Sequence, residues 1–242
     1  MSKTDLAIVV PVYNEEVSVG KVLQEWNDVL SQTNINYCFY VVNDGSRDNT
    51  AAVLESFKNK HPNLTKIITQ ANQGHGQACI NGYRAALADN IDWIFQIDSD
   101  GQCDPQYFQD LWKRKSPKIA AFGHRVSRDD GQIRMYVSKV LSTAIFFGMG
   151  VWVKDSNIPY RLIHRDLIQK HIHKIPKTFF LANALFTALL VKYDGISWSP
   201  IHFRDRFGGS PSLKGFQLFK RGASIFGDFF AYREPSSDPA AK

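Results

Sequence analysis

The sequence contains few cysteines and no long apolar run, and both absences limit what the chain can be. Among its 242 residues there are three cysteines, Cys38, Cys79 and Cys103, an odd number without the paired spacing of a metal site. We therefore expect reduced thiols, as in the cytoplasm, and no disulfide framework. The longest apolar run, Ala144–Val153, is shorter than the roughly 18 apolar residues that a transmembrane helix needs.

Acidic residues are in the minority, with 23 Asp and Glu against 29 Lys and Arg, so the formal net charge is +6. Such an excess suits anionic ligands such as nucleotide diphosphates, or an acidic membrane surface, and equally suits a solvated basic surface without a partner. The basic residues are scattered and form no recognised nucleic-acid motif, so we expect no nucleic-acid partner. The N-terminal residues run directly into an apolar stretch and show no signal-peptide pattern.

The first half of the chain alternates strand and helix patterns. Apolar, β-branched runs predict strands at 6–12, 37–42, 66–69, 92–97 and 119–123. Helical spacing predicts helices after the first three strands, at 19–30, 50–60 and 77–89, and Pro105 starts another short helix. We expect Asn14 to cap the first helix, with Glu15 and Glu16 in its first turn. The alternation predicts an α/β fold with a mostly parallel central sheet flanked by helices.

The second half is less regular. The patterns predict a long helix and its exit at 133–153, an apolar helix at 179–191, a strand at 195–203 and a glycine-rich basic loop at 204–214. Two apolar, aromatic segments, 140–153 and 216–230, are candidates for membrane contact, and each is equally compatible with a helix that packs in the core. We expect the Pro- and Ser-rich tail, 234–242, to be disordered.

The sharpest chemical signal is the triplet Asp98-Ser99-Asp100, which follows a predicted strand. Ligands bind beyond the carboxyl ends of the strands in sheets of this kind. Two carboxylates at such a position can share one hard cation, Mg²⁺ or Mn²⁺, together with substrate phosphate oxygens, and Gln102 can add a carbonyl ligand. A solvated acidic turn remains the alternative for the triplet alone.

Other polar loops follow the neighbouring strands. Asp44 can accept a hydrogen bond from a nucleobase or a ribose hydroxyl, whereas Asp48 is more typical of a helix cap. The loop with Gly74 and Gly76 can wrap a ribose or phosphate, although glycine loops are also ordinary turns. Three arginines suit phosphate recognition, or else form surface salt bridges: Arg125, Arg134 and Arg206.

Four ordered segments together resemble the inverting GT-A glycosyltransferases of family 2: PVYNEE at 11–16, VVNDGSRDNT at 41–50, NQGHGQA at 72–78 and QIDSDGQ at 96–102. The resemblance is strong over 5–110 and weaker over 120–214. Within the family the chain is most similar to the polyprenyl-phosphate branch, typified by dolichyl-phosphate mannose synthase. The matching features of that branch are Asp98-x-Asp100-x-Gln102, Gly-His-Arg125 followed by Arg134, Asp155 ahead of Arg161 and Arg165, and Arg206-Phe-Gly-Gly-Ser210.

The resemblance implies a role for each matching residue. It implies nucleoside or donor binding by Pro11, Tyr13, Glu15, Asp44 and Gly76. It implies metal binding by Asp98, Asp100 and Gln102. It implies phosphate binding by Arg125, Arg134, Arg206 and Lys214. Asp98, Asp100, Asp155 and Arg206 form the implied catalytic set. The sequence departs from the branch at Asn157–Tyr160, where the branch has Ser-Gly-Phe, and at Lys214, which is out of register.

The resemblance also implies a reaction, in which a nucleotide-diphosphate sugar donates its sugar by inverting displacement. A hydroxyl acceptor needs a carboxylate base, but 179–193 contains no acid, so a polyprenyl phosphate acceptor is favoured. A soluble enzyme that glycosylates a glycan hydroxyl, with Asp155 as base, is the alternative. A catalytically silent relative or a nucleotidyltransferase fits the motifs less well. We expect a domain at 1–233 (nucleotide-sugar half 1–110, acceptor half 111–214, amphipathic segment 215–233), at the inner membrane face or anchored by a separate membrane subunit.

Overall fold

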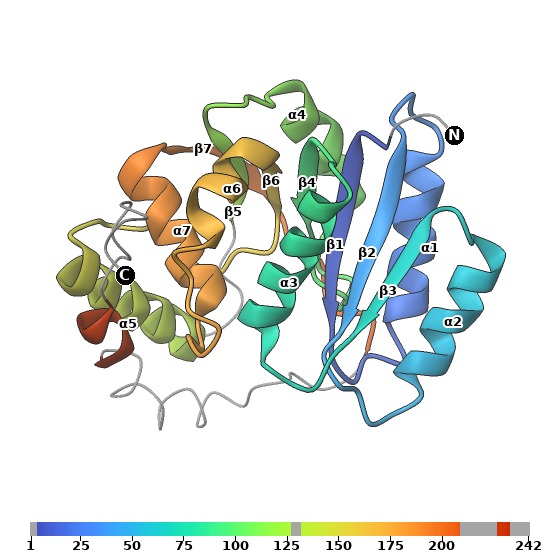
Figure 1. Cartoon of the computed structure of the whole chain (residues 1–242), viewed down its shortest axis with the longest axis horizontal. Coiled ribbons are helices and arrows are strands. Elements are labelled where there is room, and N and C mark those ends of the chain that lie inside the picture. Colours follow the sequence, from blue (N-terminus) through green and yellow to red (C-terminus); the bar gives the residue numbers. More distant parts are fainter. Residues whose placement is uncertain (1–3, 127–131, 209–226, 233–242) are drawn as a thin grey trace.

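A central sheet organises the chain. The computed structural model describes residues 4–126, 132–208 and 227–232. Seven strands pair in the order β3-β2-β1-β4-β6-β5-β7 (Figure 1). Their bounds are β1 Leu6–Val12, β2 Tyr37–Asn43, β3 Thr65–Thr69, β4 Trp93–Gln96, β5 Ala120–Arg125, β6 Arg161–His164 and β7 Ile196–Ile201. The helices are α1 Val19–Leu30, α2 Thr50–Lys60, α3 His75–Ala88, η1 Pro105–Tyr107, α4 Phe108–Lys113, α5 Gln132–Met149, α6 Arg165–Ile172 and α7 Ala182–Tyr193.

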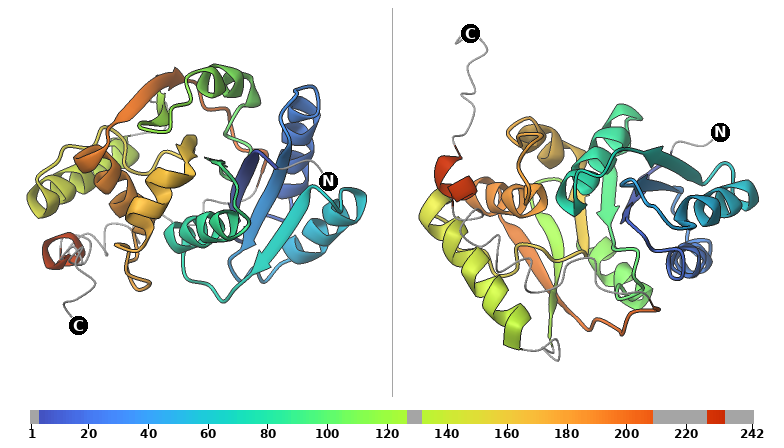
Figure 2. Two further views of the ribbon diagram at one scale, coloured as in Figure 1. Left: turned by 45° about the horizontal axis from the view of Figure 1, so that its top comes forward. Right: turned by 90° about the horizontal axis from the view of Figure 1, so that it is seen from below.

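The N-terminal half of the sheet is parallel, as the sequence predicts. β1 pairs in parallel with β2 and with β4, and β2 pairs in parallel with β3. All residues of β1 are buried, because α3 packs on one face and α1 lies on the other (Figures 1 and 2). The carboxyl ends of β1, β2 and β4 therefore meet at one edge of the sheet, here called the catalytic edge.

One strand was missed by the sequence patterns. β6 runs antiparallel to both β4 and β5, and the sequence analysis predicted neither β6 nor α6. Four residues beginning with an arginine give no strand signal that can be recognised from periodicity. The reversed direction has a consequence for the site, because it pairs Arg161, the first residue of β6, with Gln96, the last residue of β4.

The start of α1 also differs from the prediction. The helix begins at Val19 with Ser18 as its N-cap residue, and no acidic side chain lies in its first turn. Asn14 does not cap it: the residue has a φ of 52°, and its side-chain oxygen accepts a hydrogen bond from the Arg47 backbone N–H at 2.8 Å. The prediction was wrong because a polar residue before an apolar helix can equally hydrogen-bond to a neighbouring loop.

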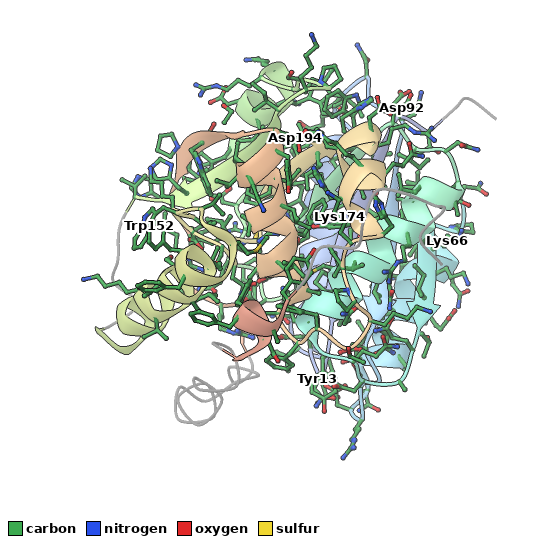
Figure 3. The ribbon with its side chains drawn as sticks, turned by 60° about the vertical axis from the view of Figure 1, so that its left-hand side comes forward. Tyr13, Lys66, Asp92, Trp152, Lys174 and Asp194 are labelled. Atoms are coloured by element: carbon green, nitrogen blue, oxygen red, sulfur yellow. The ribbon has the colours of Figure 1, made fainter. Side chains whose placement is uncertain are left out.

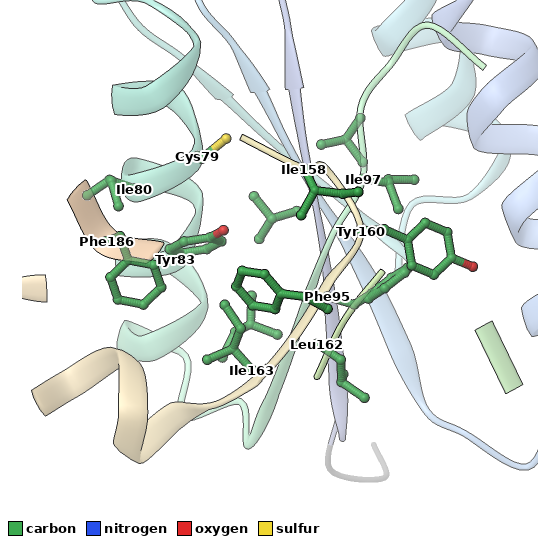
Figure 4. Packing of buried hydrophobic residues seen from close by; sticks show 14 of the residues in the cluster. Cys79, Ile80, Tyr83, Phe95, Ile97, Ile158, Tyr160, Leu162, Ile163 and Phe186 are labelled. Atoms are coloured by element: carbon green, nitrogen blue, oxygen red, sulfur yellow. The ribbon is translucent and has the colours of Figure 1, made fainter. Parts of the chain in front are cut away.

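Both faces of the sheet carry a core rich in aromatic rings. Under α1, the ring of Trp26 lies 5.4 Å from that of Phe95 and 6.1 Å from that of Tyr160. Under α3, Tyr83 packs on Phe186 at 5.6 Å (Figure 4). Within the part of the chain that the structure describes, no helix is both long and apolar enough to cross a membrane.

The contact between α3 and α7 generates a stability prediction. A Cβ atom at Gly76 would lie 2.9 Å from the Ala182 backbone nitrogen and 3.1 Å from that of Asn183. Because backbone atoms cannot move aside cheaply, we expect Gly76→Ala to lower the free energy of unfolding by about 1–3 kcal/mol in urea titrations. Gly227→Ala, whose new Cβ would meet no other described segment within 4 Å, is the control and should cost nothing. Equal stability of both variants would contradict this packing.

Candidate active site

The two aspartates of the triplet lie directly beyond β4 at the catalytic edge. Asp100 is buried, and the buried Oδ1 atom of Asp98 has no hydrogen-bond partner among the described residues. Burial raises the pKa of Asp98; His75 opposes this rise and the neighbouring Asp100 adds to it. Two adjacent carboxylates, one of them with an unsatisfied buried oxygen, make a site that favours positive charge.

Arg206 supplies part of that charge from a distant segment of the chain. Its Nη2 atom lies 2.7 Å from Glu15 Oε1 and its Nη1 atom lies 3.1 Å from Asp100 Oδ2. Burial raises the pKa of Glu15, whereas the hydrogen bond from Ser18 and the charge of Arg206 lower it in part. The arginine thus connects the loop after β1 with the loop after β4, and the predicted site residues Glu15, Asp100 and Arg206 do lie together.

The segment that carries Arg206 is fixed along the loop that follows β4. Backbone N–H groups of Arg204 and Phe207 donate to the carbonyls of Gln102 and Asp100 at 3.1 and 3.0 Å. The Arg204 guanidinium also makes two hydrogen bonds to the Glu25 carboxylate, at 2.6 and 2.8 Å. Sequence reasoning missed this bidentate pair, because nothing near Glu25 in the helix pattern signals a partner 179 residues away.

Asp44 and Gln102 are occupied by contacts within the protein. The Asp44 carboxylate accepts hydrogen bonds from the Gln70 side chain at 2.7 Å and from the backbone N–H groups of Gln73 and Gly74, each at 2.8 Å. It therefore organises the loop before α3. The backbone N–H of Gln102 donates to Asp100 Oδ1, and its side-chain amide donates to the Arg204 carbonyl at 3.3 Å. Nucleoside binding by Asp44 and metal binding by Gln102 remain predictions.

The other predicted donor-binding residues surround the end of β1. Pro11 is buried within β1 opposite Val42, and Tyr13 is partly exposed just beyond the strand at the catalytic edge (Figure 3). Gly76 lies in the first turn of α3 against the backbone of α7, which gives it a packing role in addition to any predicted ligand contact.

The charges of three further cations act on Asp98. His75 Nε2 lies 3.6 Å from Asp98 Oδ1; burial tends to lower the pKa of His75, but Cys79 and Asp98 raise it overall. Arg125, at the end of β5, stacks over the Phe203 ring at 4.2 Å, and its charge acts on Asp98.

Arg161, the third of these cations, is completely buried. Its guanidinium donates to the Ile158 and Ser156 carbonyls at 2.5 and 3.0 Å and to the Asn183 side chain at 2.5 Å. The charge of this guanidinium also acts on Asp98. The sequence analysis used Arg161 as part of a basic stretch and did not foresee its complete burial.

The structure describes the surroundings of the remaining predicted site residues less completely. Asp155 lies on the loop between α5 and β6, where its carboxylate accepts from the Asn157 backbone N–H at 3.2 Å, and its charge acts on His124 of β5. Arg134 belongs to α5, but its side chain lies outside the described residues, as does Lys214. The tail and most of segment 215–233 also lie outside them.

The residues present fit a divalent metal that keeps open positions for substrate. Among the described residues, no three His, Cys, Asp or Glu side chains converge as a complete metal site. Mg²⁺ and Mn²⁺ commonly use one or two carboxylates together with substrate phosphate oxygens. Asp98 and Asp100 match that requirement, since the Oδ1 atom of Asp98 accepts no hydrogen bond from the described residues and has only His75 nearby, at 3.6 Å.

The bridge made by Arg206 can be tested through stability. We expect Arg206→Met to lower the free energy of unfolding by about 1–3 kcal/mol, because it leaves the buried Glu15 carboxylate without its cation. Glu15→Gln added to that variant should recover much of the loss, since the uncompensated charge is then removed. Denaturant titrations of the four proteins in this double-mutant cycle measure the coupling. Strictly additive losses would show that the two side chains do not interact.

Solved structures share the fold. Glucosyl-3-phosphoglycerate synthase from Mycobacterium tuberculosis aligns with a TM-score of 0.64 at 16% identity, over 96% of this chain and 81% of that one. Mannosyl-3-phosphoglycerate synthase from Rubrobacter xylanophilus aligns with a TM-score of 0.61 at 15% identity, over 98% and 78%. The mycobacterial enzyme has also been crystallised with Mn²⁺ and UDP-glucose. These likenesses establish the GT-A fold.

The curated relatives are named for a more specific activity than the solved structures share. Undecaprenyl-phosphate 4-deoxy-4-formamido-L-arabinose transferase from Shewanella sediminis is 26% identical over 178 residues, 73% of this chain and 53% of that protein. The enzyme of that name from Pseudomonas fluorescens is 28% identical over 170 residues, 67% and 48%. The chain thus spans about half the length of the curated relatives it matches. The model of one family, Glycosyl transferase family 2, matches residues 7–183, and the chain belongs to that family.

Proposed function

We propose that this chain transfers a sugar from a nucleotide-diphosphate sugar to a polyprenyl phosphate, with inversion at the anomeric carbon. The observation that carries the proposal is the pair Asp98 and Asp100 at the end of β4, next to Arg206 and within the field of Arg125. That arrangement suits a diphosphate leaving group, because its negative charge develops among fixed cations in a partly buried site.

The donor would lie across the ends of β1 and β4. Asp98 and Asp100 would hold the divalent metal, which would supply charge neutralisation to the diphosphate. Tyr13 lies beside the nucleoside at the end of β1. Arg206 is positioned to contact the diphosphate, since its guanidinium already lies at Asp100 and its Nε atom has no hydrogen-bond partner among the described residues.

The residues in and after α7 favour an acceptor that is already anionic. α7, which packs beside the site through Gly76, contains no Asp or Glu. Asp194, just after α7, is committed to Lys170 at 2.6 Å and to His171 at 2.5 Å. A phosphate oxygen can attack without a general base, whereas a hydroxyl acceptor would need one, with Asp155 as the candidate. The names of the curated relatives support the lipid phosphate.

The proposal also covers which residues form the catalytic domain and where in the cell the domain acts. The catalytic domain covers 1–233, and it works at the cytoplasmic face of the membrane, where the phosphate head of the acceptor is accessible. Contact with the bilayer is made directly or through a separate membrane subunit.

The test is a transfer assay with purified protein. We expect radiolabel from one member of a nucleotide-sugar panel to pass into organic solvent when short-chain polyprenyl phosphate is present in detergent with Mn²⁺, and chelation with EDTA to abolish it. Asp100→Asn should reduce the rate by about 100-fold or more, because it removes a charge beside the leaving group. Its Mn²⁺ affinity, measured by electron paramagnetic resonance with nucleoside diphosphate, should fall as well.

Asp110→Asn is the matched control, since this carboxylate lies exposed on α4 beside Lys113 and should leave both transfer and Mn²⁺ binding unchanged. Label that passes only to water-soluble glycans, in an Asp155-dependent manner, would replace the lipid acceptor by a hydroxyl acceptor. Full activity of Asp100→Asn would refute the role of the triplet.

A further inference from the structure

The chain that follows β7 reaches the catalytic edge from the last strand of the sheet. β7 ends the strand order, and the chain after it returns toward β1 (Figure 2). Within residues 204–208, here called the 204–208 segment, Phe207 lies against Gly101, because an added Cβ at that glycine would lie 2.5 Å from the Phe207 ring. A Cβ at Gly208 would lie 2.9 Å from Val17. The 204–208 segment therefore contacts both the loop after β1 and the loop after β4.

Arg204 anchors this segment to α1. Its Nη1 and Nη2 atoms donate to the two carboxylate oxygens of Glu25 at 2.6 and 2.8 Å, and Nη2 also donates to the Gly101 carbonyl at 3.1 Å. Asp104 Oδ2 lies 3.8 Å from the Nε atom, but both oxygens of Asp104 already accept hydrogen bonds from Gln106. Glu25 is therefore the principal anionic partner of Arg204 among the described residues.

The geometry of this pair differs from that of a typical surface ion pair. Exposed pairs contribute little to stability, because water and salt screen the charges and both side chains lose conformational freedom. The Glu25 and Arg204 side chains are 32 and 30% exposed, and their planar groups meet through two hydrogen bonds, an arrangement that fixes the orientation of an arginine. The pair joins residues 179 positions apart, so it fixes the place of a whole segment.

The contacts of Arg206 cannot replace this anchor once a donor is bound. In the structure the Arg206 guanidinium lies on Glu15 and Asp100. Under the proposed function its N–H groups must be shared with the oxygens of the diphosphate, which weakens both contacts. Glu25 lies on α1 and is not among the residues proposed to contact the donor. Its pair with Arg204 therefore persists while Arg206 changes partners.

We propose that Glu25 is a positioning residue, which holds the 204–208 segment through Arg204 so that Arg206 is already oriented toward the diphosphate when the donor arrives. This inference rests on the proposed function for its purpose. Without the pair, the segment would have to become ordered during donor binding, and the apparent affinity would fall with the fraction of molecules that are ready to bind. The effect should fall on donor KM more than on kcat, because Arg206 itself is intact in the bound complex.

Hydrogen exchange tests the anchoring without any ligand. In full-length Glu25→Gln, peptides that cover 204–207 should exchange about fivefold faster than in the wild type. The reason is that the backbone N–H groups of Arg204 and Phe207, which donate to the loop after β4, would lose protection against local opening. Peptides from β1 should exchange at the wild-type rate, which separates local loosening from a general loss of stability.

Nucleotide affinity tests the consequence for the donor site. Calorimetric titrations with Mn²⁺ and UDP, GDP or CDP identify the nucleoside diphosphate that the wild type binds most tightly. Its dissociation constant should rise about fivefold in Glu25→Gln, and KM for the corresponding nucleotide sugar should rise similarly, while kcat changes less than about twofold. The charge exchange Glu25→Arg/Arg204→Glu should recover part of the loss, since the pair can form in the reverse order.

Asp28→Asn is the matched control, because it removes the same charge from the same helix. Asp28 is exposed and accepts a hydrogen bond from Gln24 at 2.7 Å, so its replacement should leave exchange and nucleotide affinity unchanged. Unchanged exchange at 204–207 in Glu25→Gln, or faster exchange with wild-type nucleotide affinity, would overturn the inference. An equal loss of affinity in Asp28→Asn would assign the effect to the overall charge of α1 and would overturn it as well.

The outcome separates from that of the proposed function. Exchange and calorimetry require no acceptor, so they decide the role of Glu25 even if label passes to no lipid phosphate. Weaker nucleotide binding by Glu25→Gln, together with transfer only to water-soluble glycans, would support the positioning role and replace the lipid acceptor. If the wild type binds none of the three nucleotides, the positioning role and the proposed function fail together.

Discussion

The site depends on the compensation of buried negative charge at the end of one strand. Glu15 and Asp100 are buried, and Asp98 has one buried oxygen that accepts no hydrogen bond from the described residues. Isolated carboxylates in such surroundings would take up protons, so nearby cations are needed to keep them charged. Arg206 contacts two of the three, while His75, Arg125 and Arg161 act on Asp98. The other contacts around the catalytic edge hold these cations in place.

Different parts of the fold hold the cations in place. The geometry of the site therefore depends on elements from both halves of the chain. Arg161 begins the antiparallel strand β6 and is fixed by carbonyl groups, with no carboxylate among its hydrogen-bond partners in the described residues. Arg206 depends on the neighbouring Arg204, whose guanidinium is held by Glu25 of α1. The catalytic edge thus requires the second half of the chain, although the recognisable motifs lie in the first.

The sequence predicted much of the structure of residues 1–110 because the signals there are local. Strand and helix periods in β1 to β4, and the carboxylates that follow β4, depend on neighbours in the chain. Contacts between distant segments gave no such signal. Asn14 pairs with Arg47, Asp44 with the loop before α3, and Glu25 with Arg204. A four-residue strand such as β6 is recognisable only once its partners are known. The α5 segment was ambiguous for a related reason, since an apolar run does not reveal which of its faces is covered.

Arg206 is the side chain through which the charge balance at Glu15 and Asp100 would be coupled to donor binding. In the structure it neutralises Glu15 and Asp100, but an arginine that binds a diphosphate must share its donors with the incoming phosphate oxygens. Adding a diphosphate alone would place more negative charge beside three carboxylates. Because Asp98 and Asp100 can accept a divalent cation at the same time, the added charges compensate each other and the arginine can turn toward the phosphate without leaving Glu15 and Asp100 unbalanced. Under the proposed function, the same side chains that balance the charge at the catalytic edge would therefore make donor and metal binding mutually dependent.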